Sequence, residues 1–161
     1  MQFLFMSLFA LGIVGVDQLV KYLIVANIPL YGQAPLVPGI IKLTYVQNTG
    51  AAFSMLSGMQ WLFVVIFVLL TALLVFEYFK KPMPFTKFER FCIAAVYGGG
   101  LGNMIDRVFL GYVVDMFQTE FITFPIFNVA DIFITCGCIA LIIYVLFFDR
   151  EATRPQKGDT E

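Results

Sequence analysis

Four long apolar stretches alternate with shorter polar segments along the chain. The stretches cover residues 1–26, 59–79, 88–108 and 128–148. Each can cross a bilayer core of about 30 Å, which takes about 20 helical residues. A helix is also the only form in which an isolated segment satisfies its backbone hydrogen bonds in lipid. The pattern therefore predicts an all-α membrane protein with four transmembrane helices, forming a single membrane-embedded domain over residues 1–161.

The connecting segments carry weaker signals. The first loop, residues 27–58, is divided by prolines and glycines, and residues 40–46 alternate β-branched or aromatic side chains with others, which predicts a strand. We expect a small β element on the outer membrane surface. The third loop holds apolar residues without Lys or Arg between 117 and 126, which is typical of an interfacial segment and would suit a lid. The polar tail, residues 149–161, is predicted to be disordered.

Composition agrees with this interpretation and excludes some function classes. The chain of 161 residues is 60% hydrophobic and only 13% charged, which does not fit a soluble domain with a polar exterior. Its formal net charge is −1, and the basic patch expected of a nucleic-acid-binding protein is missing. We therefore predict no nucleic-acid partner.

Loop charges predict the orientation. The second loop with its flanks and the C-terminal tail hold most of the basic residues, whereas the first loop has Lys42 and the third has Arg107 at its helix junction. Basic residues are enriched in cytoplasmic loops. Both termini are thus expected in the cytoplasm. Loops one and three would then face outward.

The residue types available for chemistry are few. There is no histidine, and the three cysteines, Cys92, Cys136 and Cys138, lie inside apolar stretches, where cysteine is usually a small buried hydrophobe. We expect neither a disulfide framework nor a zinc site. Asp115 and Asp131 remain as candidates, because an ionisable group at membrane depth costs at least about 2.5 kcal/mol and commonly marks function.

Asp115 and Asp131 flank the outward third loop, so a hairpin fold can bring them face to face. Two carboxyl groups that lie close together share a proton, which leaves one as base and the other as acid. Such a pair can activate water and protonate a leaving amine. The competing interpretation is structural: Asp115 would be a solvated loop residue and Asp131 a helix N-terminal carboxylate favoured by the helix dipole.

Several polar residues could support this pair. Asp17 and Lys21, one helical turn apart, are expected to form an ion pair, and this structural role is favoured over direct chemistry. Residues 48–54 predict a tight turn in which Gly50 permits close backbone approach. Asn128, three residues before Asp131, can hydrogen-bond into the pair.

A glycine-rich segment, residues 97–107, predicts that either a neighbouring helix or a substrate approaches its backbone. At its end Asn103, Asp106 and Arg107 share one helix face, which favours a polar scaffold. Arg107 is also a candidate for holding a substrate main chain or a lipid headgroup.

Five blocks in order carry a resemblance that spans nearly the whole chain: Asp17-Gln-Leu-Val-Lys21, Asn48-Thr-Gly-Ala-Ala-Phe-Ser54, Gly102-Asn-Met-Ile-Asp106-Arg107, Gly111-Tyr-Val-Val-Asp115-Met-Phe117 and Phe127-Asn-Val-Ala-Asp131. With these blocks the chain resembles the lipoprotein signal peptidase (signal peptidase II) family, bacterial membrane aspartyl endopeptidases. The resemblance implies cleavage of prolipoproteins just before a diacylglyceryl-modified cysteine, at the outer face of the cytoplasmic (inner) membrane.

The resemblance also implies roles for individual residues. Asp115 and Asp131 match the catalytic pair. The positions that match substrate-binding or site-supporting residues are Asp17, Lys21, Asn48, Gly50, Gly102, Asn103, Asp106, Arg107, Asn128 and Ala130. The implied partners are lipidated prolipoproteins, membrane lipids and globomycin-type inhibitors, with no metal or other cofactor.

Two other functions stay open on the residues alone. A magnesium-dependent lipid phosphotransferase could use Asp17, Asp106, Asp115 and Asp131 as oxygen ligands, and a chelator would then abolish its activity. A proton-coupled carrier would use intramembrane acids as a relay and would spread them across the membrane depth. In this chain the acids gather toward the predicted outer end.

Overall fold

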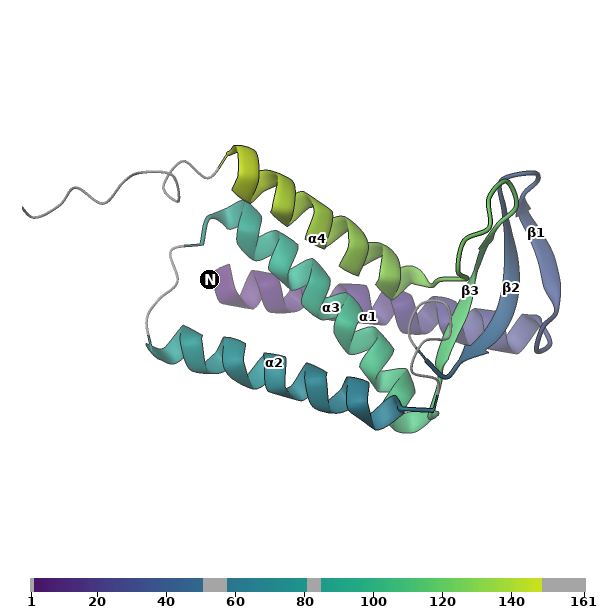
Figure 1. The fold of residues 1–161 in the computed structure, drawn as a ribbon, viewed down its shortest axis with the longest axis horizontal. Helices are drawn as coiled ribbons and strands as arrows, with labels where there is room; N and C mark the ends of the chain where they lie inside the picture. Colours follow the sequence, from purple (N-terminus) through teal and green to yellow (C-terminus); the bar gives the residue numbers. More distant parts are fainter. Residues whose placement is uncertain (1, 51–57, 81–84, 149–161) are drawn as a thin grey trace, which may run out of the picture.

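The computed structural model of this chain describes residues 2–50, 58–80 and 85–148. Figure 1 shows helices running side by side, with a small sheet at one end of the bundle. The elements follow in the order α1 (Gln2–Asn27), β1 (Gln33–Val37), β2 (Ile41–Asn48), α2 (Gln60–Lys80), α3 (Lys87–Phe109), β3 (Val113–Thr119) and α4 (Val129–Phe147). The four helices lie within two residues of the four predicted stretches at each end.

Local sequence signals explain where α3 and α4 begin. Thr86 caps α3 and exchanges hydrogen bonds with Glu89, and Asn128 caps α4 and exchanges them with Asp131. In each case the cap side chain accepts from the third helical N–H while the acidic side chain accepts from the cap N–H. The two polar loops therefore end at defined residues. For α4, the capping acid is also a candidate catalytic residue.

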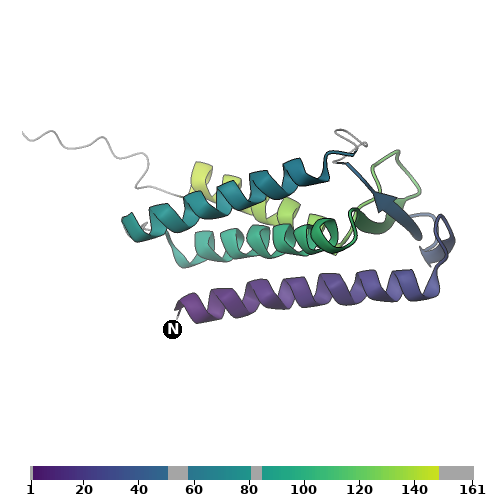
Figure 2. The same ribbon diagram turned by 90° about the horizontal axis from the view of Figure 1, so that it is seen from below.

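Glycines on α3 allow the helices to pack closely. A Cβ atom added at Gly98 would lie 2.9 Å from the carbonyl oxygen of Ala10 on α1, and one at Gly99 would lie 2.5 Å from that of Ala130 on α4. Of the two interpretations of this segment, close approach of neighbouring helices is the one that the structure bears out here. Figure 2 shows α3 in the middle of the bundle, between α1 and α2.

The sheet has three antiparallel strands in the order β1-β2-β3. The predicted strand over residues 40–46 corresponds to β2. A strand was not predicted in the third loop, but residues 113–119 form β3 and pair with β2. The strand overlaps the expected interfacial segment, residues 117–126, only at residues 117–119. Asp115 therefore lies on a strand, opposite Val46, and not on a solvated loop.

A small apolar core joins the sheet to the end of α1. It contains Ile24, Ile28, Tyr45, Val114 and Met116, all buried. Because Val114 and Met116 flank Asp115, this core fixes the strand on both sides of that residue. The strand position of Asp115 thus depends on packing between segments about ninety residues apart in the chain.

The apolar surface of the bundle agrees with a membrane protein. Among the described residues, two helices are long and apolar enough to cross a membrane by length and composition, Leu4–Asn27 and Val129–Phe147, and Gln60–Phe76 is a shorter apolar helix. Helix α3 carries Lys87, Glu89, Arg90, Asp106 and Arg107 besides its glycines, which lowers its hydropathy. The predicted tail disorder and the turn residues 51–54 lie outside the described residues.

Candidate active site

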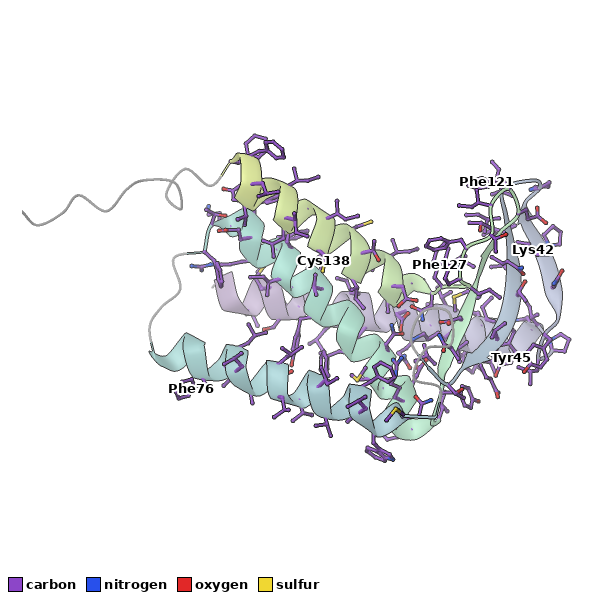
Figure 3. All side chains as sticks on the ribbon, viewed as in Figure 1. Lys42, Tyr45, Phe76, Phe121, Phe127 and Cys138 are labelled. Atoms are coloured by element: carbon purple, nitrogen blue, oxygen red, sulfur yellow. The ribbon has the colours of Figure 1, made fainter. Side chains whose placement is uncertain are left out.

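Polar side chains gather where the helices meet the sheet. In Figure 3 the helical side chains away from the sheet are mostly carbon, whereas nitrogen and oxygen atoms concentrate near the sheet. The polar groups there include Asp17, Lys21, Asn103, Asp106, Asp115 and Asn128, all at most 6% exposed. Buried charges persist only where they are paired and hydrogen-bonded. Each of these groups has such partners.

The innermost group is an ion cluster of three residues, Asp17, Lys21 and Asp106. The Lys21 ammonium lies 2.8 Å from Asp17 Oδ2 and 2.9 Å from Asp106 Oδ2. The predicted pairing of Asp17 with Lys21 is confirmed. The second carboxylate, which comes from α3, was not predicted to join them. One cation between two buried carboxylates makes this cluster a fixed structural unit.

The ion cluster also includes neutral neighbours. Gln18 Nε2 donates to Asp106 Oδ1 at 2.8 Å and to the Gly102 carbonyl at 3.1 Å. Gly102 has no room for a side chain, since a Cβ would lie 2.6 Å from Asp17 Oδ2. Sequence reasoning missed Gln18. Its place beside Asp17 and one turn from Lys21 was the available signal.

Two asparagines connect the ion cluster to the candidate catalytic acids. Lys21 Nζ donates to Asn103 Oδ1 at 3.0 Å, and Asn103 Nδ2 donates to Asp131 Oδ1 at 2.8 Å. Asn128 Nδ2 donates both to Asn103 Oδ1 at 3.0 Å and to Asp115 Oδ1 at 2.7 Å. Since Lys21 can only donate, the Asn103 oxygen must face it, and the amide NH2 is left for Asp131.

Asp115 lies on β3 and is 2% exposed. Its Oδ1 accepts from Asn128 and its Oδ2 accepts from Asn48 Nδ2 at 2.8 Å. Burial raises the pKa of this carboxyl from an ordinary value of 3.8 to about 7, and repulsion from Asp131 adds to the rise, while the amide hydrogen bonds and Lys21 oppose it. Asp115 therefore exchanges its proton near neutral pH.

Asp131 lies on the first turn of α4. Its Oδ2 accepts from the Asn128 backbone N–H at 3.2 Å, and its own N–H donates to Asn128 Oδ1 at 3.0 Å. With the bond from Asn103, both of its carboxylate oxygens have donors. The predicted hydrogen bonding of Asn128 into the acid pair, meaning Asp115 and Asp131, is confirmed. Asn128 bonds to both acids.

The acid pair opens on one cavity of about 480 Å³. Its polar wall is formed by Asn48, Asn103 and Arg107 with the two acids. Its apolar wall consists of third-loop and α4 residues, which are Phe124, Pro125, Ile126, Phe127, Ile132, Ile134, Thr135 and Cys136. Figure 3 shows Phe127 beside β3, near the start of α4. Such a cavity can hold a largely apolar ligand against a few polar groups.

Arg107 and the Asn48 turn form the other edge of the cavity. Gly50 N donates to Asn48 Oδ1 at 2.9 Å, which closes the predicted turn at its first residues. Arg107 Nη2 donates to the Gly50 carbonyl at 3.0 Å, and its guanidinium carbon lies 4.7 Å from the centre of the Phe63 ring. Arg107 thus joins the first loop to α3, and it stands beside the cavity.

The arrangement suits acid–base chemistry with water. Two carboxyl groups face one cavity, and one of them titrates near neutral pH. Over residues 2–50, 58–80 and 85–148, no group of three His, Cys, Asp or Glu side chains is placed to hold a metal ion. The alternative magnesium site would have used four carboxylates, and two of these, Asp17 and Asp106, bind Lys21 instead.

The predicted site residues lie close together in the fold. Asp17, Lys21, Gly102, Asp106 and Ala130 form the inner part, where the Ala130 N–H donates to Asp17. Asn103 joins this part to the cavity wall. Asn48, Gly50, Arg107, Asp115, Asn128 and Asp131 lie at or beside the cavity.

Comparison with known proteins gives consistent matches. The family model described as signal peptidase (SPase) II matches residues 9–147. A lipoprotein signal peptidase of Latilactobacillus sakei subsp. sakei is 44% identical over 147 residues, covering 91% of this chain and 96% of that protein. One from Enterococcus faecalis is 42% identical over 149 residues, covering 91% and 90%.

Solved structures agree with the sequence matches. A bacterial membrane enzyme solved by the in meso method at 2.3 Å has a TM-score of 0.82 and 32% identity, covering 97% of this chain and 94% of that one. A second such enzyme, solved at 1.9 Å, has a TM-score of 0.78 and 36% identity, with coverages of 89% and 93%.

Proposed function

Since this chain belongs to the signal peptidase II family and has the function of a lipoprotein signal peptidase, we propose that Asp115 and Asp131 are its catalytic groups. The observation that carries the proposal is that both carboxyl groups line one cavity and accept hydrogen bonds from the same residue, Asn128. The enzyme is then an aspartic endopeptidase that acts on prolipoproteins without a metal or other cofactor.

The two acids have different roles in this mechanism. The raised pKa of Asp115, about 7, supports it as the proton donor at mildly acidic to neutral pH. Asp131, whose two oxygens accept from Asn103 and from the Asn128 backbone, is then the base. Neutral amide donors hold both acids in position and leave protonation free to change.

Hydrolysis proceeds by attack of a water oxygen on the scissile carbonyl carbon. Asp131 takes one proton from this water while Asp115 protonates the carbonyl oxygen, which gives a neutral tetrahedral diol. When the C–N bond breaks, the proton held by Asp131 passes to the leaving nitrogen and Asp115 recovers its proton from the diol. The products are the signal peptide, released as a carboxylic acid that then loses its proton to water, and the free amine of the lipidated cysteine.

The cavity walls divide substrate recognition between two surfaces. The apolar wall of third-loop and α4 residues suits the signal peptide and the diacylglyceryl chains, which lie in the bilayer. Asn48, Gly50 and Arg107 would meet the substrate main chain on the polar side. Membrane lipids and globomycin-type peptide inhibitors would contact the same walls.

We also propose the membrane arrangement that this chemistry requires. The four helices cross the cytoplasmic (inner) membrane as one domain over residues 1–161, with both termini in the cytoplasm. The sheet and the acid pair lie at the extracytoplasmic face, where residues 121–126 of the third loop act as a lid. Loop charges and the position of the sheet at one end of the helices (Figure 1) support this arrangement.

Replacement of each acid by its amide tests the mechanism. Asp115→Asn and Asp131→Asn should each reduce cleavage of a purified diacylglyceryl-modified precursor by about 10⁴-fold, at the upper end for acid–base groups. Glu120→Gln is the matched control, because Glu120 is an exposed carboxylate after β3 that bonds to Gly39 N. It should cleave at the parental rate.

The same assay is run with and without EDTA. A rate insensitive to the chelator is expected, and a chelator-dependent rate would favour metal-assisted chemistry. A folded Asp115→Asn or Asp131→Asn variant with the parental rate would overturn the acid pair.

A further inference from the structure

The residue immediately before each of the two acids is held by a different buried carboxylate. Ala130 precedes Asp131, and its N–H donates to Asp17 Oδ1 at 2.9 Å. Val114 precedes Asp115, and its N–H donates to Asp106 Oδ2 at 3.0 Å. Both carboxylates are at most 2% exposed. The backbone beside each of the two acids is therefore held by a hydrogen bond to a buried carboxylate of the ion cluster.

The Lys21 ammonium joins these two attachments. It lies 2.8 Å from Asp17 and 2.9 Å from Asp106, so a continuous series of contacts runs from the start of α4 to β3. The series consists of the Ala130 N–H, one carboxylate, one ammonium, a second carboxylate and the Val114 N–H. Each contact is charge-assisted and shielded from water, which favours short and rigid geometry.

We infer that the ion cluster of Asp17, Lys21 and Asp106 sets the separation of Asp115 and Asp131, so that its members, together with Gln18, are positioning residues for peptide hydrolysis. This inference rests on the proposed function of the acid pair. It differs from a general stabilising role because the cluster contacts the backbone one residue from each acid. A change in the cluster therefore alters the distance that the reaction depends on.

Gln18 selects the orientation of one carboxylate. Its Nε2 donates to Asp106 Oδ1, while Asp106 Oδ2 takes both Lys21 and the Val114 N–H. Without this donor, Oδ1 loses its partner Gln18 and the plane of the Asp106 carboxylate is held through Oδ2 alone. Gly102 contributes by leaving space for Asp17, as its Cβ would meet that carboxylate at 2.6 Å.

The charge-removing variants Asp17→Asn and Asp106→Asn test the inference with the full-length enzyme and a diacylglyceryl-modified precursor. A misplacement of about 1 Å costs about 10²-fold in rate. We expect kcat to fall about 10²-fold in each variant, with KM within about threefold of the parent, because neither residue lines the cavity. A change confined to KM would overturn the inference.

The double variant separates joint positioning from two independent effects. When either end of the cluster is lost, the separation of the acids is no longer set, so the double variant should be no slower than the slower single variant. If the two losses multiply to about 10⁴-fold, the residues act independently and the inference is wrong.

Glu89→Gln is the matched control. Glu89 is a buried carboxylate on α3 that also accepts from a backbone N–H, that of Thr86 at 2.7 Å, but at the end of α3 far from the acid pair. Measured at the same interval below its own unfolding midpoint, it should retain the parental kcat. If kcat falls as much as in the cluster variants, the loss follows from removing any buried carboxylate, and the inference is wrong.

Gln18→Leu keeps all three charges and covers the case in which the charged variants do not fold. Its kcat should fall about tenfold, the lower end of the effect of one lost hydrogen bond to a charged group, at unchanged KM. A folded Gln18→Leu enzyme with parental kcat would contradict the inference. Asp115→Asn is assayed in parallel: if it cleaves normally, the proposed function fails, and if only the cluster variants cleave normally, this inference alone fails.

Discussion

Two pairs of carboxylates lie next to each other in this protein, and their partners differ. Asp17 and Asp106 share one ammonium at 2.8 and 2.9 Å. Asp115 and Asp131 receive hydrogen bonds from Asn48, Asn103 and Asn128. In the part of the chain that the structure describes, neither member of the acid pair lies in an ion pair.

The difference separates the carboxylates of the ion cluster from the proposed catalytic acids. An ion pair fixes the position of a carboxylate and favours its charged form. Amide donors position a carboxylate with a smaller bias, and burial can then raise its pKa, as it does for Asp115. A group that must gain and lose a proton in each turnover therefore needs neutral partners. The following substitutions test this contrast.

Asn128→Asp should have the largest effect. It exchanges the NH2 donor to Asp115 for an oxygen and places a third carboxylate beside the pair, while an acceptor for the Asp131 N–H remains. We expect cleavage to fall about 10³-fold, within the range for acid–base catalysis, with α4 still capped. Initial rates on a lipidated precursor measure this, and Asn128→Ala, which also loses the cap, is the comparison. A rate within tenfold of the parent would contradict it.

The pH dependence of stability should be the next largest effect. The pKa of Asp115 is raised from 3.8 to about 7, so between these values the folded state binds more protons than the unfolded state. Stability from this group is then full below about pH 4 and is lost as pH rises to about 7, by about 4 kcal/mol at most. Unfolding of parent and Asp115→Asn across pH 4–8 measures the difference. If the difference in unfolding free energy between parent and variant does not change with pH, the raised pKa of Asp115 is contradicted.

Gly102→Ala should disturb the ion cluster directly. The new methyl group would meet Asp17 Oδ2 at 2.6 Å and displace it from Lys21. Breaking a buried pair costs about 3 kcal/mol of unfolding free energy, which denaturant titration in detergent measures. Gly15→Ala on α1 is the control, because no atom lies within 4 Å of its Cβ position, and a gain of about 0.5 kcal/mol is expected. Equal effects of the two substitutions would refute the close contact.

Phe63→Leu should have the smallest effect. It removes the ring 4.7 Å from the Arg107 guanidinium, an interaction worth about 0.5–1 kcal/mol. We expect kcat/KM for the precursor to fall by at most about fivefold. Phe67→Leu, one turn along α2, removes a ring that stacks on Tyr97 instead of on a cation, and should leave kcat/KM unchanged. A larger loss of kcat/KM for Phe67→Leu than for Phe63→Leu would show that the ring contact with Arg107 does not cause the effect.

The sequence predicted the elements better than it predicted their contacts. The apolar stretches located the four helices, because helix length and hydropathy are local properties. The β3 strand was missed, since Val113 and Val114 precede an acid with no clear alternation, and the strand exists through its pairing with β2. Which loop joins a sheet is decided by tertiary packing.

The site was predicted in the same uneven way. Spacing on one helix was enough to pair Asp17 with Lys21, and spacing before α4 was enough to link Asn128 to Asp131. The addition of Asp106 to that pair depends on how α1 crosses α3, which the glycine-lined contact decides. Gln18 was missed because an uncharged residue among apolar neighbours gives little signal until its partner is known.

The start of α4 has a consequence for the evolution of this enzyme. Asp131 closes the capping box with Asn128, and Asn128 also bonds to Asp115. A substitution at either position therefore changes the proposed chemistry and the helix start together. If the proposed mechanism holds, an inhibitor that contacts this turn leaves few routes to resistance, because a mutation that weakens its binding there also damages both catalysis and the start of α4.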